Sequence, residues 1–472
     1  MIFLWLPLGF VIPTLCGWTL LRLLEGRHPV LFALERWVMG FLLGTTLTMY
    51  LTVMAQIAGL ISFTKIGFLT VQIALLLLLE GLFLWKRKTI AAPSPRPQPI
   101  PSLTGWKKIG FIVIGVWIAI KVVTGILLLT TTPVYFDDVF NNWNMRGKIF
   151  FETKELTLVM EAGNEILSVG GVGSYPPTVP LLKTWFATLA GRWHDGLVSA
   201  PHILWYLAAT LLVYFFLRRQ SSFWIACLGV YVLASIPLYL IHGSTPYADV
   251  FLSVHVFIAL TFPFSAVSAK TREHRLAFYR LGAVAAAMLI FTKNEALVLH
   301  LPPILLVTGL ALLWNLQRRE LSLRDTLGIG ARYGIAVGLV AIPWIWFKWM
   351  HNLPFGNAKD IPLSDFSWQE GVLYSISINT FFEGNWIFLF PFLLALFVFS
   401  RQRAWRTPAV MFTVFLLIVY GMQLPIYLFT GISTEALQQT GYARGLIHLV
   451  PISVVLMVML LEDLLRRKRL IA

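Results

Sequence analysis

Long apolar segments separated by short polar connections make up most of the chain. Segments of about 18 to 23 residues have the length that an α-helix needs to cross a hydrocarbon core of about 30 Å. The pattern therefore predicts an all-α, polytopic integral membrane protein with about thirteen transmembrane helices. The predicted spans lie near residues 2–21, 37–59, 66–85, 109–130, 197–217, 222–241, 249–268, 276–293, 296–314, 329–350, 376–399, 408–430 and 445–465.

The connections carry most of the basic residues. The formal net charge is +15, although only 12% of the residues are charged. Because these residues are spread over separate short connections and form no continuous face, we interpret them as topology signals and expect no nucleic-acid partner. The positive-inside rule predicts an outer amino terminus and a cytoplasmic RRKR tail. Cys16 and Cys227 lie within apolar spans, which predicts neither a disulfide framework nor a cysteine metal site.

A proline-rich stretch, AAPSPRPQPIP at residues 91–101, divides the chain. Proline holds such a segment extended, so it is interpreted as a cytoplasmic linker. The predicted divisions are a three-helix membrane bundle (1–90), the linker (91–108), a catalytic membrane core (109–350) and an outer loop with the last three spans (351–472).

The apolar segment 176–190 is too short to fit the pattern of spans. It begins after a proline pair, and counting it as a crossing would put half of the basic connections on the wrong side. We therefore predict a re-entrant or surface-lying helix on the outer face, buried against protein.

Asp137 and Asp138 stand where the span 109–130 leaves the membrane, in the stretch FDDVFNNWNMRGKIFF. One aspartate can cap the following helix, but a cap needs only one carboxylate, and paired acids can divide base and cation-binding roles. Helical spacing separates Phe140, Trp143, Gly147 and Phe150. This spacing predicts an interfacial helix with its apolar face toward lipid.

Other outer connections hold further polar candidates. His242 and Asp249 flank the turn HGSTPYAD, where each could serve as a cap or as an interfacial group, or could bind a cation together with Asp138. Lys293 and Glu295 interrupt two apolar runs, as a local salt bridge or as a site for a lipid phosphate.

Two more connections complete the set of candidates. Arg444 and His448 lie one helical turn apart in YARGLIHLVP, and the guanidinium fork of arginine suits a phosphate. Tyr175 precedes the proline pair, and Lys183 follows it within the short apolar segment, where the two are candidates for shaping a substrate opening.

The order of these pieces resembles the GT-C superfamily of polyprenyl-phosphate-dependent glycosyltransferases. It is most similar to the bacterial group near family 39, which includes protein O-mannosyltransferases and the lipid A aminoarabinose transferase. The resemblance covers residues 109–315 and, more weakly, 444–451. The matching positions are Asp137 and Asp138, Tyr175 with Pro176 and Pro177, the turn 245–249, and Thr292 with Lys293. GSY at residues 173–175 departs from relatives that carry an acidic and a basic residue there.

The resemblance implies an inverting membrane glycosyltransferase at the outer face of a bacterial plasma membrane. It would move a sugar from a polyprenyl-phosphate carrier to a glycan, lipid or protein acceptor. Asp137 or Asp138 would take the acceptor proton, and Lys293 and Arg444 would balance the phosphate charge. The other substrate-binding candidates are Asp249, His242, Tyr175, Glu295 and His448. No cofactor is implied beyond a possible divalent cation, for which Asp138 and Asp249 are the candidate ligands.

Two alternatives remain. A transporter or flippase for a lipid-linked substrate also combines membrane spans with buried charges, but it typically shows internal repeats and midplane polar sites. A non-catalytic assembly protein would tolerate replacement of Asp137, Asp138 and Lys293.

Overall fold

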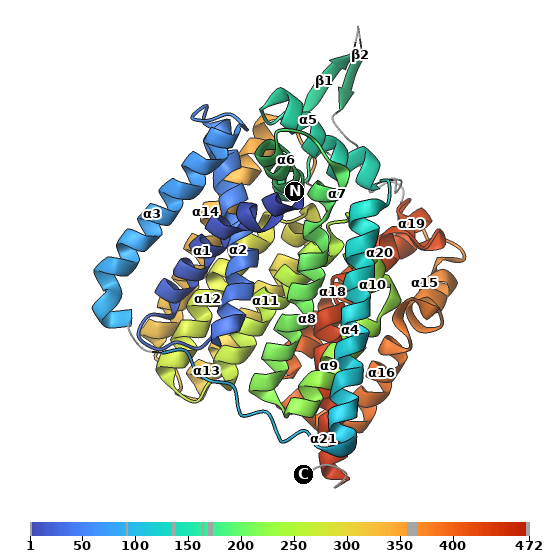
Figure 1. Cartoon of the computed structure of the whole chain (residues 1–472). Coiled ribbons are helices and arrows are strands. Elements are labelled where there is room, and N and C mark those ends of the chain that lie inside the picture. Colours follow the sequence, from blue (N-terminus) through green and yellow to red (C-terminus); the bar gives the residue numbers. More distant parts are fainter. Residues whose placement is uncertain are drawn as a thin grey trace.

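The apolar runs fold into long helices that lie side by side (Figure 1). The computed structural model describes residues 2–90, 93–134, 138–162, 165–168, 173–355 and 366–468. The helices of the first half are η1 (Ile2–Leu4), α1 (Trp5–Glu25), α2 (Ala33–Ile57), α3 (Lys65–Ile90), α4 (Gly105–Thr131), η2 (Val139–Asn144), α5 (Met145–Thr153), α6 (Thr178–Ala190), α7 (Asp195–Ser199), α8 (Pro201–Gln220), α9 (Phe223–Ser235) and α10 (Pro237–Gly243). Those of the second half are α11 (Asp249–Ser268), α12 (Arg272–Ile290), η3 (Ala296–His300), α13 (Leu301–Gln317), α14 (Leu323–Met350), α15 (Val372–Phe381), η5 (Gly384–Trp386), α16 (Leu389–Phe399), α17 (Arg401–Arg406), α18 (Val410–Phe429), α19 (Ser433–Leu437), α20 (Gly441–Ile447) and α21 (Val450–Arg467).

The predicted count of about thirteen crossings is not confirmed. Among the described residues, nine helices are long and apolar enough to cross a membrane, or up to twelve if each of three bent pairs is one span. The bent pairs occupy the predicted spans 222–241, 376–399 and 445–465, with bends of 73°, 106° and 53°. The remaining predicted span, 276–293, corresponds to α12, which is not among the candidates because four of its residues, all in its first half, are charged.

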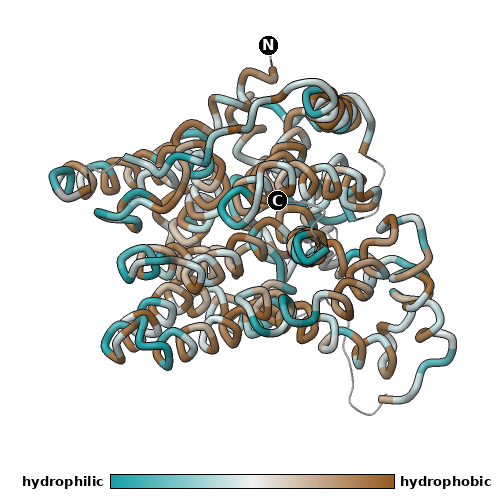
Figure 2. The backbone as a smooth tube through the Cα atoms, turned by 90° about the horizontal axis from the view of Figure 1, so that it is seen from below, coloured by the Kyte–Doolittle hydropathy of each residue, from teal (hydrophilic) through white to brown (hydrophobic). Residues whose placement is uncertain are grey.

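The two ends of the bundle differ in what they carry. A two-stranded antiparallel hairpin, β1 (Val159–Ala162) with β2 (Glu165–Ser168), projects from one end, which we call the hairpin end (Figure 1). At the other end, the basic end, Arg218 donates to the carbonyl of Gln98 in the linker and Arg219 pairs with Glu35. Seen from that end, hydrophilic turns connect helices that are largely hydrophobic (Figure 2). The predicted basic connections therefore do gather at a common end.

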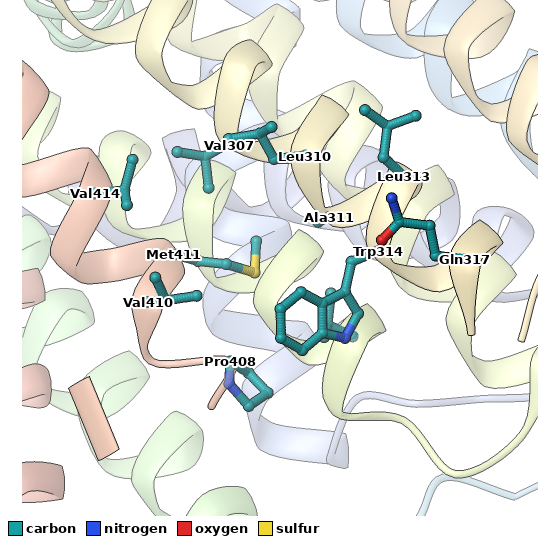
Figure 3. A pocket seen from close by; sticks show the side chains of 11 residues that line it. Val307, Leu310, Ala311, Leu313, Trp314, Gln317, Pro408, Val410, Met411 and Val414 are labelled. Atoms are coloured by element: carbon teal, nitrogen blue, oxygen red, sulfur yellow. The ribbon is translucent and has the colours of Figure 1, made fainter. Parts of the chain in front are cut away.

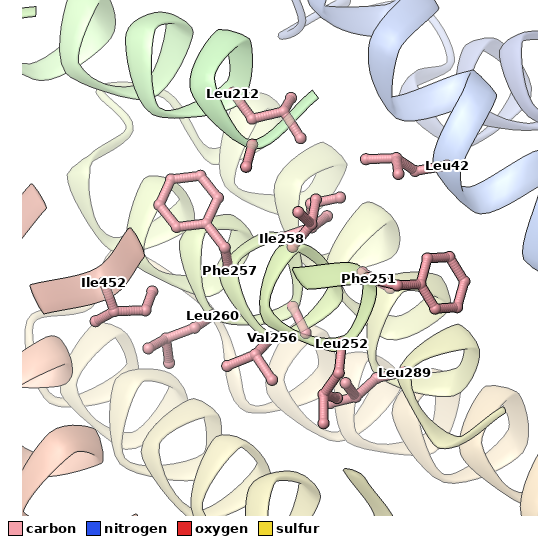
Figure 4. Packing of buried hydrophobic residues seen from close by; sticks show 14 of the residues in the cluster. Leu42, Leu212, Phe251, Leu252, Val256, Phe257, Ile258, Leu260, Leu289 and Ile452 are labelled. Atoms are coloured by element: carbon pink, nitrogen blue, oxygen red, sulfur yellow. The ribbon is translucent and has the colours of Figure 1, made fainter. Parts of the chain in front are cut away.

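Helix α11 forms the centre of the bundle and is buried along nearly its whole length. Figure 4 shows its apolar side chains meeting Leu42 of α2, Leu212 of α8, Leu289 of α12 and Ile452 of α21. A helix that is apolar on every side can be surrounded by protein or by lipid, and α11 is surrounded by protein, since 94% of its apolar window is buried. Asp249, the first residue of α11, is thus fixed at the hairpin end by the best-packed element of the fold.

The first two helices are built into this bundle. Gly17 of α1 and Gly44 of α2 face each other's backbones, and a side chain at either position would collide with carbonyl groups of the other helix. Small residues allow such close helix contacts. Thr46 of α2 also lies 2.9 Å from His255 of α11 through its hydroxyl and the imidazole Nε2. The division of the chain at the linker stays a prediction.

The segment after α4 differs from the predicted interfacial helix. It forms the π-helical η2 followed by α5, and only Phe140 is exposed. Trp143 and Phe150 are fully buried, and α5 packs on α6, where Gly147 approaches the carbonyl of Pro180. The prediction that this apolar face contacts lipid is therefore wrong, because a second helix of the same loop covers it.

Helix α6 is the short apolar segment predicted to be re-entrant or surface-lying. Its thirteen residues are too few to cross a bilayer, and all but the last are buried. It lies at the hairpin end beside α5 and α7 and contacts α1, with Trp185 donating to the carbonyl of Gly9. As predicted, it is not a crossing and is buried against protein.

Candidate active site

The carboxylate of Asp249 is the centre of a polar network at the hairpin end of α11. The side chain is fully buried, and two cations bind it: Lys293 Nζ lies 2.9 Å from Oδ1 and Arg444 Nε lies 3.2 Å from Oδ2. Two imidazoles add to these contacts, His242 Nδ1 at 3.1 Å from Oδ2 and His448 Nε2 at 3.2 Å from Oδ1. A buried carboxylate needs such compensation, and this one receives it from three separate parts of the chain.

Lys293 and Glu295 lie in the turn between α12 and η3. Besides its contact with Asp249, Lys293 pairs with Glu295 at 3.2 Å. Burial alone would lower the pKa of Lys293, but the carboxylates of Asp249 and Glu295 outweigh it and raise the pKa. Burial likewise favours a raised pKa for Glu295, yet Lys293 lowers it. Both groups are therefore ionised at neutral pH, and the predicted local salt bridge is one part of a larger network.

Arg444 connects the first outer loop to the core. It lies on α20, and it donates from Nη1 to Asp138 while Nε donates to Asp249. Its guanidinium carbon is 5.1 Å from the ring centroid of Tyr247, which in turn stacks on His242. The fork geometry of arginine makes this double contact possible. Residues 306 positions apart in the chain are thereby joined.

Asp138 is the more accessible of the two described aspartates in this network. Its side chain is 41% exposed, whereas that of Asp249 is 0% exposed. Asp138 precedes η2 in a helical conformation, and its side chain makes no capping hydrogen bond. The capping alternative therefore does not apply to Asp138, which pairs with Arg444. Asp137 lies outside the described residues.

Tyr175 contacts the network through Glu295 and Lys293. Its hydroxyl donates to Glu295 Oε1 at 3.0 Å, and its ring centroid lies 5.6 Å from Lys293 Nζ. Burial, followed by the negative charge of Glu295, raises the pKa of Tyr175 well above its usual value, so the phenol stays protonated. Trp143 of η2 lies against the ring at a centroid separation of 5.4 Å. Tyr175 thus positions the loop before α6 against the turn that holds Lys293.

The structure brings together Asp138, Tyr175, His242, Asp249, Lys293, Glu295, Arg444 and His448. Lys183 does not join them. It is buried in α6, where its Nζ lies 3.4 Å from the carbonyl of Val198, and burial lowers its pKa to about 7. The expectation that Lys183 shapes a substrate opening is therefore not supported.

Three polar residues next to this network were not predicted from the sequence. Arg146 is 1% exposed and donates from Nη2 to the carbonyl of Tyr175 at 3.0 Å. Lys348, at the end of α14, donates to Asn294 Oδ1 at 2.8 Å. His300 Nε2 lies 3.1 Å from His448 Nδ1. The signal was an ionisable residue within or beside an apolar run, which usually marks a working site.

Arg146 and Lys348 share a further property. Within the described part of the chain, neither pairs with a carboxylate, and Arg146 Nη1 has no hydrogen-bond partner. Buried cations without an acid are costly unless another negative group approaches. Counting only the residues that the structure describes, three carboxylates (Asp138, Asp249, Glu295) face two paired cations (Lys293, Arg444), so these two extra cations change the sign of the local balance.

A metal site does not fit the arrangement of the candidate ligands. Both carboxylate oxygens of Asp249 are bound by cations and imidazoles, and Asp138 shares Arg444 with it. No group of three or more His, Cys, Asp or Glu residues suited to a metal ion occurs among the residues that the structure describes. A divalent cation stays a hypothesis.

Comparison with solved structures identifies the fold. The chain is similar to the crystal structure of ArnT from Cupriavidus metallidurans in the apo state, with a TM-score of 0.53 and 16% identity over 77% of this chain and 61% of that one. It is also similar to the same protein bound to undecaprenyl phosphate, with a TM-score of 0.52 and 17% identity over 76% of this chain and 61% of that one. The chain thus spans about three fifths of the length of ArnT.

The chain has an ArnT-like fold and is an integral, multi-pass membrane protein. The predicted all-helical membrane architecture is confirmed, apart from the helix count and the small hairpin. No protein-family model and no curated protein sequence matches the chain.

Proposed function

We propose that the protein is an inverting membrane glycosyltransferase that moves a sugar from a polyprenyl-phosphate carrier to an acceptor at the outer face of the membrane. The observation that carries the proposal is the ion network at the hairpin end. An acid from the first loop, an acid from the central helix and cations from two later segments meet within hydrogen-bonding distance. The likeness to a protein solved with undecaprenyl phosphate supports a lipid-phosphate donor.

The acceptor base is Asp138. It is the half-exposed acid of the network, whereas Asp249 is buried and both of its oxygens are engaged. As the acceptor hydroxyl oxygen bonds to the anomeric carbon, its proton passes to the Asp138 carboxylate. The bond between the anomeric carbon and the phosphate oxygen breaks, and the carrier phosphate leaves with the electron pair. Attack on the face opposite the phosphate inverts the anomeric configuration.

The phosphate is received on the cationic side of the network. Lys293 and Arg444 stabilise the charge that develops on the leaving oxygen. Both already have carboxylate partners, and the three described carboxylates outnumber the two cations, so Lys293 and Arg444 alone leave no excess positive charge. Arg146 and Lys348, which lack acid partners among the described residues, supply the excess positive charge. Arg146 is hydrogen-bonded to the segment 173–175, and Lys348 is hydrogen-bonded to Asn294 next to Lys293.

Asp249 has a positioning role in this scheme. It holds Lys293 and Arg444 at fixed separations and binds the buried His242 and His448 in the same network. Preorganised charges of this kind stabilise a transition state without moving during the reaction. The sugar is oriented by the imidazoles and by Tyr175.

The test is turnover of a defined donor by the purified protein in lipid. Labelled polyprenyl-phosphate sugars are supplied as a panel, and release of the free carrier is followed. Asp138→Asn should reduce kcat by about 10² or more, the usual contribution of a general base, while the yield of folded protein is unchanged. Asp137→Asn, by contrast, separates the roles of the adjacent acids.

The matched control is Asp463→Asn, which removes a carboxylate from α21 at the basic end, far along the helix from the network. It should turn over at the wild-type rate. Carrier release by Asp138→Asn and Lys293→Ala at the wild-type rate would refute the transferase site. Movement of the intact donor across the bilayer without release of carrier would instead identify a transporter.

A further inference from the structure

A cavity lies away from the ion network, between α11, α13 and α18. Its volume is about 330 Å³, and it is lined by apolar side chains apart from Gln317. Figure 3 shows Val307 and Ala311 of α13 facing Met411 and Val414 of α18 across it. Such a space suits a hydrocarbon chain, since it offers almost no hydrogen-bonding groups.

The cavity lies at the basic end of the bundle. It involves the last turns of α11 and α13 and the first turn of α18, whereas the network lies at the opposite ends of α11 and α13. From His300 beside the network to Gln317 at the cavity, α13 rises by about 25 Å, at 1.5 Å per residue. The cavity is therefore a separate site, near the other surface of the bilayer.

The cavity opens sideways, toward the hydrocarbon. Leu310 and Leu313 border it and are 50% and 52% exposed. Both α13 and α18 have the length and composition of membrane spans, so exposed leucines on them face lipid tails. A lipid chain can enter from the bilayer without crossing an aqueous phase.

Three cations lie within three residues along the chain of residues that line the cavity. Arg318 follows Gln317, and its guanidinium carbon lies 4.5 Å from the ring centroid of Trp314 in the cavity wall. Lys270 follows α11 and Arg406 precedes Pro408, and both are exposed. None of the three is in an ion pair within the described residues, whereas nearby Arg272 pairs with Asp325.

We propose that this cavity binds one acyl chain of an anionic phospholipid from the leaflet at the basic end, with the lipid phosphate against Lys270, Arg318 and Arg406. A prenyl tail descending from the network would fill the apolar space but would leave the cations at the rim without a counterpart. A phospholipid satisfies both parts, because its charged head and apolar chain are adjacent. Juxtamembrane cations attract anionic lipids in this way.

The test is native mass spectrometry of the full-length protein in neutral detergent. Phosphatidylglycerol and phosphatidylcholine with identical acyl chains are titrated separately, and the fraction of protein with one bound lipid is measured. The wild type should bind phosphatidylglycerol in preference. Arg318→Gln/Arg406→Gln should weaken its binding by about fivefold for each cation removed, since one cation near the lipid surface contributes about 1 kcal/mol.

The charge control is Arg87→Gln/Lys88→Gln, which removes two exposed cations from the end of α3, a helix that packs on α1 and α2. It should bind as the wild type does. For the apolar part, Leu310→Trp fills the cavity edge, and Leu306→Trp adds the same ring on the same helix away from the cavity. Only Leu310→Trp should reduce binding.

Three results would overturn the proposal. Equal binding of the two phospholipids would remove the role of the cations. Equal loss in both double variants would mean a diffuse charge effect with no defined site. Displacement of phosphatidylglycerol by polyprenyl phosphate, with loss of the latter in Leu310→Trp, would assign the cavity to the carrier tail.

Discussion

Asp249→Asn removes one negative charge from the centre of the network and keeps the shape of the side chain. Among the described carboxylates, Lys293, which is 2% exposed, then retains only Glu295, and Arg444 retains only Asp138. Removing one partner of a buried ion pair costs about 3–5 kcal/mol, because the remaining charge is left buried without compensation. The unfolding entropy of about 2.1 cal/mol/K per residue gives roughly 1 kcal/mol/K for a chain of 472 residues. The melting temperature should therefore fall by roughly 3–5 °C.

The assay is thermal unfolding of the purified protein in detergent, followed by intrinsic fluorescence. Adding Lys293→Met to Asp249→Asn should restore part of the loss, because the uncompensated cation is gone. The coupling between the two substitutions should be about 1–3 kcal/mol, the range for residues in direct contact. Arg272→Gln is the control, since it breaks a pair whose arginine is 53% exposed at the basic end. It should unfold close to the wild type.

The reasoning is refuted if Asp249→Asn and Arg272→Gln unfold at the same temperature. It is also refuted if the Asp249 and Lys293 substitutions are additive. Additivity would mean that the two side chains do not compensate each other, although their charged atoms are 2.9 Å apart.

Three further outcomes are expected. Gly44→Val should lower the yield of folded protein sharply, because its side chain would collide with the carbonyl of Pro13; Gly110→Val, which has open space, is the control, and size-exclusion chromatography is the measurement. Burial lowers the pKa of Lys183 to about 7, so the unfolded chain binds the proton more readily than the folded protein. The free energy of unfolding should therefore rise by about 3 kcal/mol between pH 7 and 9.5. Melting curves of Lys183→Met at the two pH values should lack this rise. Arg146→Met should lower carrier release while the melting temperature stays near that of the wild type. The variant loses two hydrogen bonds, but it no longer buries a cation without an acid partner, and the two effects offset each other. A large fall in melting temperature would assign Arg146 a purely structural role.

The helical architecture followed from the sequence because apolar length and basic connections act locally. Each span needs only its own composition to be recognised, and α6 stood out because its thirteen residues are too few to cross a bilayer. The count of thirteen is not confirmed because the predicted span 276–293 corresponds to α12, whose first half carries four charged residues.

The sequence singled out most residues of the ion network but not the contacts that join them. Asp138, Asp249, Lys293 and Arg444 stood out as charges at the ends of apolar runs. That Asp249 is the shared partner of the other groups depends on contacts across 44 to 199 residues of chain, which no local pattern encodes. The lipid-facing assignment of Trp143 and Phe150 failed for the same reason, because a helix thirty residues later covers them.

Because Arg444 pairs with both Asp138 and Asp249, the ion network can form only after α20 has been synthesised. Asp138 and Asp249 enter the membrane long before residue 444 leaves the ribosome, and until α20 arrives neither acid has the guanidinium that joins them. Within the part of the chain that the structure describes, Asp249 then has one cation partner, Lys293, and the first loop has no ion pair with the core. A nascent chain can thus complete most of its helix packing before this ion network is joined, and the network is assembled last.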